Sequence, residues 1–342
     1  MTPCKILLQR LQKLHVSPSQ FIHLAKRNYH FTPRVFSVGN GDDTLRGIIR
    51  YWSQRFEDEG IPEPVGSIEH ILAHVIGRKS ILDLANYFDR KLTAEEAKKL
   101  ELLCECRLSR MPVQYIIGEW DFRDITLKLV PPIFIPRPET EFFIDFILKR
   151  LSESSGSPRV LEIGTGSGAI SLALAHSCDK VHCIAIDQNP HACDLARENC
   201  RNLNLQDRIS IVNATLEAPG RIQKIDNQCG VDFEEDKFDF IVSNPPYVPT
   251  KKIMNLEPEV KVFEDIRALD GGPDGLKLIK PIMRYASTAL NPLGHLFLEI
   301  DTSHSEYIKF FTEKFTDLNL KFDHVYKDYC NNDRFIEITK LK

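Results

Sequence analysis

The sequence predicts an α/β protein in which a small helical bundle precedes a mostly parallel sheet with helices on both faces. Three observations lead to this prediction. Apolar residues follow helical spacing from about residue 43 to residue 118, with no strand-like alternation between them. From about residue 118 apolar and polar residues alternate, which predicts a β-hairpin. After residue 158, seven apolar strand-like segments follow, most of them separated by helical ones.

The first helical segment, "DTLRGIIRYWSQRFEDEG", places its apolar residues on one face and ends at Gly60, a favourable residue just past a helix end. In the next helix, "IEHILAHVIG", we expect Ser67 to be the N-cap. The third, "LTAEEAKKLELLCECRLSR", begins with Thr93 three residues before Glu96, the spacing of a capping box. These signals predict a helical bundle.

The second part begins with the hairpin and the proline-braced loop "FIPRPETE", and the linker "SESSGSP" follows a helix. Its seven predicted strands are "RVLEIG", "KVHCIAID", "RISIVNA", "FDFIVSN", "HLFLEID", "FDHVYKD" and "RFIEITK". We expect a long polar loop after the third strand and a second long loop after the fourth. Helices are expected from Ala169, from about Pro190, over residues 276–290, and between the fifth and sixth strands.

The composition is that of a globular protein of about two domains, with 342 residues, 42% hydrophobic and 27% charged. No apolar run reaches the roughly 18 residues of a membrane-spanning helix, so no membrane association is expected. The nine cysteines form no disulfide framework, and we expect reduced thiols.

The first 41 residues contain six Lys or Arg and no Asp or Glu, which predicts a mitochondrial transit peptide; a basic disordered tail is the alternative. Without them, 38 basic residues face 48 acidic ones, and the formal charge falls from −4 to −10. An acidic body argues against non-specific nucleic-acid binding, although a local basic groove is compatible with it.

A glycine-rich loop follows the first strand of the sheet in "VLEIGTGSGAI", and the next strand ends in Asp187. Glycines let a backbone approach a ligand at a helix N-terminus, and a carboxylate about 20 residues later can accept hydrogen bonds from a ribose. This pattern predicts a nucleoside-containing cofactor. Glu162 favours S-adenosylmethionine over NAD, because a carboxylate suits an ammonium group and repels a pyrophosphate. The predicted cofactor contacts are Glu162, Gly164, Thr165, Gly166, Ser167, Gly168 and Asp187.

The fourth strand ends in the polar corner Asn244, Pro245, Pro246 and Tyr247. An Asn oxygen and the Pro245 carbonyl can both accept hydrogen bonds from a planar NH₂ group and orient its nitrogen toward an electrophile. The prolines fix the backbone, and the Tyr247 ring can pack against a planar substrate. An ordinary turn is the alternative, but the position behind a cofactor loop favours catalysis.

His70 and His74 lie four residues apart on a predicted helix, a spacing that can bind a metal. No third ligand accompanies them, so we expect a surface or interhelical role and no metal site.

The sequence resembles the release factor glutamine methyltransferase family, which modifies the glutamine of the Gly-Gly-Gln motif in class I peptide release factors. The resemblance extends from about residue 118 to the C-terminus and rests on "PVQYIIGEWDF", "FIPRPETE", "LEIGTGSGAI", "VSNPPYV" and "FEDIRALDGGPDGL". The preceding helical region resembles the N-terminal domain of the family less distinctively.

The resemblance implies a seven-stranded, Rossmann-like S-adenosylmethionine-dependent methyltransferase domain. It implies that the glycine loop and Asp187 bind the cofactor, that Asn244 to Tyr247 hold the substrate amide, and that Arg137 and Thr140 line the cofactor pocket. Where many relatives have Asp and an aromatic residue near the adenine, this chain has "VNATLEAP", so residues 213–216 are the candidates for that contact.

The expected organisation is a transit peptide (1–41), a helical substrate-recognition domain (42–118) and a catalytic domain that includes the hairpin (119–342). The expected function is N5-methylation of glutamine in a mitochondrial release factor, in the matrix, by a monomer. The alternatives are a DNA or RNA amino-methyltransferase, a non-catalytic binding module and, more remotely, a nicotinamide dehydrogenase.

Overall fold

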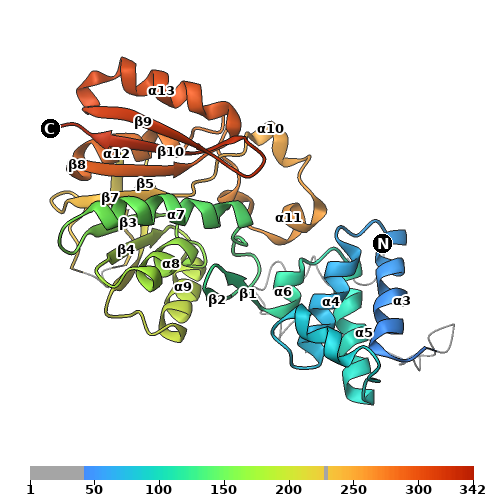
Figure 1. Cartoon of the computed structure of the whole chain (residues 1–342). Coiled ribbons are helices and arrows are strands. Elements are labelled where there is room, and N and C mark those ends of the chain that lie inside the picture. The colour runs from blue at the N-terminus through green and yellow to red at the C-terminus, as the bar shows by residue number, and fades with distance from the viewer. Residues whose placement is uncertain (1–41, 227–229) are drawn as a thin grey trace. The chain divides into compact units, whose positions relative to one another are not determined.

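The computed structural model describes residues 42–226 and 230–342 (Figure 1). The expected transit peptide, residues 1–41, lies outside the described residues. No helix in the described part of the chain is both long and apolar enough to cross a bilayer.

The chain divides into two compact units. One unit is mainly helical; it runs to Trp120 and also includes residues 129–132 and 257–263. The other unit carries the large sheet and consists of residues 121–128, 133–256 and 264–342.

The helical unit buries the apolar faces that the sequence predicted, with Leu45, Trp52 and Phe56 at its centre. Thr93 and Glu96 form the predicted capping box, because each side chain bonds the backbone N–H of the other at 3.2 and 2.9 Å. Its elements are α3 (Leu45–Asp58), α4 (Pro64–Val75), η1 (Ile81–Tyr87), α5 (Ala94–Leu108), α6 (Val113–Ile117) and α11 (Pro258–Phe263).

The prediction that Ser67 caps a helix is wrong. Helix α4 begins at Pro64, whose fixed φ suits the first helical position, so Ser67 lies inside the helix and is buried. Its hydroxyl accepts a hydrogen bond from Arg107 Nε at 3.1 Å. The guanidinium of Arg107 also pairs with Glu259 of α11 at 3.1 Å, and this buried ion pair fastens α11 within the helical unit.

The predicted hairpin is present as β1 (Glu119–Phe122) and β2 (Ile125–Lys128). The main sheet has the strand order β6-β5-β4-β3-β7-β8-β10-β9, in which β3, β4, β5, β7 and β8 are parallel. The parallel strands and the last two have these bounds: β3 (Arg159–Ile163), β4 (His182–Asp187), β5 (Ile209–Glu217), β7 (Phe238–Ser243), β8 (Leu290–Glu299), β9 (Leu320–Lys327) and β10 (Asp333–Lys340).

The sheet has eight strands instead of the predicted seven, because β6 (Arg221–Lys224) lies in the segment predicted as a polar loop. Gly220, at φ 89°, turns the chain back so that β6 pairs antiparallel with the end of β5. Ile222 is buried and supplies the apolar contact of this short strand. One buried residue in a polar segment is too weak a pattern to predict a strand.

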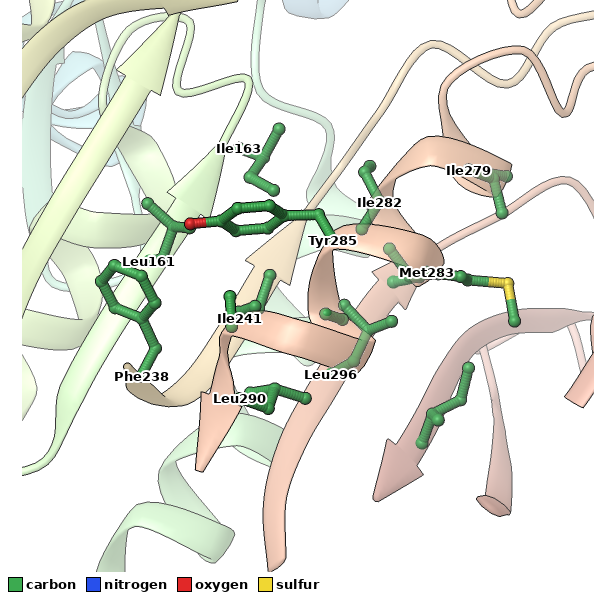
Figure 2. Close-up of a cluster of buried hydrophobic side chains, with 14 of the residues drawn as sticks. Leu161, Ile163, Phe238, Ile241, Ile279, Ile282, Met283, Tyr285, Leu290 and Leu296 are labelled. Atoms are coloured by element: carbon green, nitrogen blue, oxygen red, sulfur yellow. The ribbon is translucent and has the colours of Figure 1, made fainter. Parts of the chain in front are cut away.

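Helices α7 (Pro138–Glu153), α8 (Ala169–Ser177) and α9 (Pro190–Asn202) cover one face of the sheet, and α12 (Ile279–Ala289) and α13 (Ser305–Lys314) cover the other (Figure 1). Figure 2 shows the Tyr285 ring of α12 extending toward Leu161 of β3, and Ile282 and Met283 of α12 belong to the same buried cluster as Leu161 and Ile241 of the strands. Burial of these side chains fixes the sheet, and therefore the strand ends, in place. The remaining short elements are α10 (Thr250–Ile253), η2 (Ile266–Ala268), η3 (Thr302–His304) and η4 (Thr316–Leu318).

Candidate active site

The carboxyl ends of β3, β4 and β7 meet at one edge of the sheet. The chain runs from β3 to β4 and β5 on one side and resumes at β7 on the other, so the strand order reverses beside β3. Open α/β sheets bind ligands at such a reversal. The Ser243 hydroxyl donates to the Ile163 carbonyl at 2.6 Å and holds the ends of β7 and β3 together. This register brings the glycine loop, Asp187 and Asn244 to the same edge.

The glycine loop turns sharply between β3 and α8. Gly164, Gly166 and Gly168 have φ values of 82°, 57° and 90°, a region that favours glycine. A Cβ added at Gly164 or Gly166 would meet no atom within 4 Å, so the backbone faces open space at these two residues. At Gly168 the φ of 90° itself favours glycine, and a Cβ there would also lie 2.7 Å from the end of the Leu172 side chain, which would have to shift. Thr165 and Ser167 are buried within the loop.

The carboxylate of Asp187 holds the backbone of the loop. It accepts from the Gly166 N–H at 2.9 Å and from the Asn189 N–H at 2.8 Å, one on each oxygen. Burial raises the pKa of Asp187, although these two hydrogen bonds act in the opposite direction. Each oxygen has a further lone pair that can accept a hydroxyl hydrogen. The group therefore fits the predicted role as an acceptor for a ribose.

Glu162 lies beneath the loop and is 1% exposed. Its Oε2 accepts hydrogen bonds from the Thr165 hydroxyl at 2.8 Å and from the Ser171 N–H at 3.2 Å, and the Ser171 hydroxyl donates to the same atom. Burial raises the pKa of Glu162 to about 7, against the effect of these hydrogen bonds. The charged form of this carboxylate is destabilised by burial, and yet the protein keeps it next to the turn where a cofactor is expected.

The Asn-Pro-Pro-Tyr corner follows β7 directly. Pro245 is buried, whereas Asn244, Pro246 and Tyr247 are half-buried. The Tyr247 phenol donates to Glu299 at 3.1 Å, and burial followed by the nearby Glu299 charge raises the pKa of Tyr247. The phenol is therefore protonated at neutral pH, and its ring is fixed at the corner.

The segment "LDGGPDGL" packs against the backbone of the corner. The Val248 carbonyl accepts a hydrogen bond from the Gly271 N–H, and the Val248 N–H donates one to the Leu269 carbonyl, both at 2.9 Å. A Cβ at Gly271 would lie 2.7 Å from the backbone carbonyl oxygen of Pro246. A Cβ at Gly275 would lie 2.4 Å from the backbone carbonyl oxygen of Tyr247. The glycines therefore allow this loop to support the corner at a distance that a side chain would prevent.

Arg137 and Thr140, expected to line a cofactor pocket, both contact carboxylates of the protein. Arg137 Nη2 lies 2.7 and 2.8 Å from the two oxygens of Glu264, which is buried. The Thr140 hydroxyl is buried and donates to Glu299 Oε2 at 2.8 Å. These contacts join the "IPRPET" segment to the rest of the site, and contact with the cofactor stays a prediction.

Residues 213–216, the candidates for an adenine contact, lie within β5, and residues 214–216 pair there with β6. The Asn213 side chain donates to the Asp187 carbonyl at 2.7 Å. Asn213 therefore bonds the residue that ends β4, and which of these four residues contacts adenine stays a prediction.

Sequence reasoning missed Glu299 and Glu264. Both are almost completely buried and bond residues of the predicted site, Glu299 through Thr140 and Tyr247 and Glu264 through Arg137. The available signal was a charged residue in an apolar strand, "HLFLEID", because a buried carboxylate needs a partner.

Outside this site, His295, Asp323 and Glu337 bring potential metal ligands within 4.8 Å of one another. Glu337 already accepts from Arg150 at 2.7 Å and from Tyr326 at 2.6 Å. Burial acts to raise the pKa of Glu337, but hydrogen bonds from His295, Arg150 and Tyr326 outweigh it and lower this pKa to about 2. The cluster is thus explained as an internal ion-pair network.

Comparison with known proteins gives consistent matches over most of the chain. Residues 48–118 match the PrmC N-terminal domain, and residues 140–259 match the methyltransferase small domain. MTRF1L release factor glutamine methyltransferase from Homo sapiens is 38% identical over 300 residues, which cover 86% of this chain and 86% of the relative. A release factor glutamine methyltransferase from Geobacter sulfurreducens is 31% identical, over 78% of this chain and 87% of the relative.

The methyltransferase domain and the observed sheet agree with the predicted fold, and they confirm S-adenosylmethionine as the methyl donor. Both relatives exceed 30% identity over most of their length. Proteins that share only a general fold need not be this similar in sequence. The chain belongs to the release factor glutamine methyltransferase family.

Proposed function

We propose that this enzyme transfers a methyl group from S-adenosylmethionine to the side-chain N5 nitrogen of the glutamine in the Gly-Gly-Gln motif of a mitochondrial class I peptide release factor. The observation that carries the proposal is the position of Asn244. It follows the last residue of β7, next to the end of β3 and its glycine loop. An amide-binding side chain and a cofactor loop at one sheet edge fit methyl transfer to a planar nitrogen.

The residues at this edge fit the cofactor. Backbone at Gly164 and Gly166 faces open space at the start of α8, and Asp187 and Glu162 supply carboxylates for hydroxyl and ammonium groups. When bound, S-adenosylmethionine supplies an electrophilic methyl group on a sulfonium centre. We assign its binding to Glu162, Gly164, Thr165, Gly166, Ser167, Gly168 and Asp187, with Arg137, Thr140 and Asn244 at the border of the pocket.

The corner is suited to a weak amide nucleophile. The lone pair of an amide nitrogen is delocalised into its carbonyl, so the nitrogen attacks only when it is oriented and its developing positive charge is stabilised. The Asn244 Oδ1 and the Pro245 carbonyl are the two acceptors that we assign to the substrate NH₂. Pro245 and Pro246 fix the backbone, and Tyr247 packs against the amide plane.

The experiment that tests this function compares three acceptors, with residues 42–342 as enzyme and S-adenosylmethionine labelled in its methyl group. The acceptors are a mitochondrial release factor, the same factor with the glutamine of Gly-Gly-Gln changed to Ala, and duplex DNA. We expect label on the first acceptor alone. Label on DNA, or equal label on both release factors, would overturn the proposed substrate.

The mitochondrial location is supported by residues 1–41, which carry six basic and no acidic residues. We propose that they direct the enzyme to the matrix, where it acts as a monomer. Residues 1–41 fused to a fluorescent protein should carry it into mitochondria. Light scattering of the purified enzyme should give the mass of one chain, and cytosolic fluorescence or a dimer mass would refute the respective proposal.

We further propose that residues 42–118 recognise the release factor and that residues 119–342 carry out the transfer. The match of residues 48–118 to a domain family of its own supports a separate role. Hydrogen exchange of the full enzyme with and without the release factor tests the assignment. Slower exchange within residues 42–118 is expected, and unchanged exchange there at a saturating factor concentration would contradict it.

Substitution of Gly275 by Ala is expected to lower both stability and the rate of methyl transfer. Its φ of 77° is strained for Ala, and the new Cβ would lie 2.4 Å from the backbone carbonyl oxygen of Tyr247 at the corner. The strain and the overpacking together should lower the free energy of unfolding by about 2 to 4 kcal/mol.

Gly272→Ala is the matched control, because its φ is 84° but its Cβ would meet only the Lys277 side chain. It should lose about 1 to 2 kcal/mol of stability, and kcat should be nearly unchanged. Urea unfolding and kcat are measured for both variants. Equal kcat values would show that the loop does not position the corner.

A further inference from the structure

A chain of hydrogen bonds runs from Asn244 into the protein. The Asn244 amide nitrogen, Nδ2, donates to the Thr140 hydroxyl at 3.3 Å, and this hydroxyl donates to Glu299 Oε2 at 2.8 Å. The other carboxylate oxygen of Glu299 accepts from the Tyr247 phenol at 3.1 Å. Glu299 is the last residue of β8, whose neighbour Leu298 pairs with Ser243, so it lies beside the start of the corner. One carboxylate is thus linked to both ends of the Asn-Pro-Pro-Tyr motif, directly to Tyr247 and through Thr140 to Asn244.

The chemistry of this chain fixes its direction. When Glu299 is ionised, its carboxylate only accepts, so Thr140 must give its single hydroxyl hydrogen to Glu299. The Thr140 oxygen can then only accept from Asn244, which requires the NH₂ end of the amide to face Thr140. The Oδ1 end must therefore face away from Thr140. Because the two ends of an amide have nearly the same shape, packing alone would not select this orientation.

We propose that Glu299 is a positioning residue that acts through Thr140 to orient the Asn244 amide with its oxygen toward the substrate. This inference rests on the proposed function and extends it, because a substrate NH₂ needs an acceptor at this position. With the amide reversed, two NH₂ groups would face each other and the substrate would lose one of its two acceptors. The buried carboxylate thus has a role that a neutral residue of the same shape could not fill.

Glutamine at position 299 would reverse the chain. A phenol can also accept a hydrogen bond, but with the glutamine NH₂ toward Tyr247 the phenol hydrogen would lose Oε1, the acceptor that the described residues give it. The carbonyl of the glutamine would therefore occupy that position, and its NH₂ would face Thr140. The Thr140 hydroxyl would accept this hydrogen bond and give its own hydrogen to Asn244. The Asn244 amide would then turn its oxygen toward Thr140 and its NH₂ toward the substrate.

Protonation of Glu299 should have a similar effect in the wild-type enzyme. Burial raises its pKa to about 7, while hydrogen bonds from Thr140 and Tyr247 and the charge of Arg334 act to lower it and the charge of Glu139 acts to raise it. Below this pH the carboxylic acid can donate to Thr140 and permit the reversed amide. We therefore expect kcat to fall as the pH falls through about 7.

The test compares Glu299→Gln, Thr140→Ser and Thr140→Val at saturating S-adenosylmethionine. Glu299→Gln and Thr140→Val should lower kcat by about 10- to 100-fold. In Glu299→Gln, which changes no residue assigned to the cofactor pocket, the Kd of the cofactor should stay within about twofold of wild type. Thr140→Ser keeps the hydroxyl and should retain most of the rate. The fall of kcat near pH 7 should be absent in Glu299→Gln. Wild-type kcat and pH profile in Glu299→Gln, or equal rates for the Ser and Val variants, would overturn the proposal.

A second measurement needs no acceptor. In the NMR spectrum of the folded enzyme, the Asn244 NH₂ protons should show nuclear Overhauser effects to the Thr140 side chain, and these should weaken in Glu299→Gln. Their absence in the wild type would refute the orientation, whatever the substrate is. If the wild type instead shows them but does not methylate the release factor, only the proposed function fails.

Discussion

Replacement of Asn244 by Ala is expected to lower kcat for methyl transfer by about 10²- to 10³-fold, the usual cost of removing one preorganised group that stabilises developing charge. The variant loses the Oδ1 acceptor that holds the substrate nitrogen and leaves the Thr140 hydroxyl without its donor. The Kd of S-adenosylmethionine should change by less than about tenfold, because the glycine loop and Asp187 are untouched. Rapid-mixing kinetics and calorimetry measure the two quantities separately.

The matched control is Asn202→Ala, which makes the same chemical change at an exposed residue that ends α9. It should keep wild-type kcat. Two results would show that Asn244 does not act on the acceptor amide as proposed. One is a loss of cofactor affinity in Asn244→Ala as large as the loss of kcat, and the other is a variant with wild-type kcat and wild-type cofactor affinity.

Replacement of Glu162 by Gln is expected to stabilise the cofactor-free enzyme and to weaken cofactor binding. A shift of the pKa from 4.5 to about 7 in a fully buried carboxylate corresponds to about 3 kcal/mol of lost stability at pH 8. Gln keeps a carbonyl oxygen for Thr165 and Ser171 but carries no charge. Loss of a charge-assisted contact to the cofactor should raise its Kd by about 10- to 100-fold.

The sign of the pH dependence follows from the raised pKa. The carboxylate destabilises the folded state above about pH 7, and this penalty disappears as the pH falls toward the unfolded value of 4.5. The stability advantage of Glu162→Gln should therefore be full at pH 8 and should fall to about 1 kcal/mol at pH 5. Urea unfolding at both pH values, with Glu162→Ala as a variant that loses the acceptor as well, tests this. A Kd equal to that of the wild type in Glu162→Gln would show that Glu162 only supports the loop.

The edge of the sheet was predictable because its signals are local. An apolar strand that ends in a glycine turn, in Asp187 or in Asn244 places those residues at a carboxyl end, and parallel strands bring such ends together. Sequence reasoning therefore found the glycine loop, Asp187 and the corner at the edge where the structure has them. Their roles in catalysis stay predictions that the variants above test.

The supporting contacts were not predictable because they join distant parts of the chain. Glu299 bonds Thr140 across 159 residues, and Glu264 bonds Arg137 across 127. No local pattern specifies such partners; only the cost of burying a carboxylate indicates that a partner exists. The wrong expectation for Ser67 has the same cause, since Pro64 set the start of the helix and Arg107, 40 residues away, bonds the serine.

The central claim is methylation of one glutamine nitrogen by the Asn244 corner, and tandem mass spectrometry of the release factor after reaction tests it most directly. The account predicts one added methyl group, on the glutamine side chain of Gly-Gly-Gln, in the wild-type reaction and its near absence with Asn244→Ala. A methyl group on any other residue, or equal methylation by the Asn244→Ala variant, would contradict it.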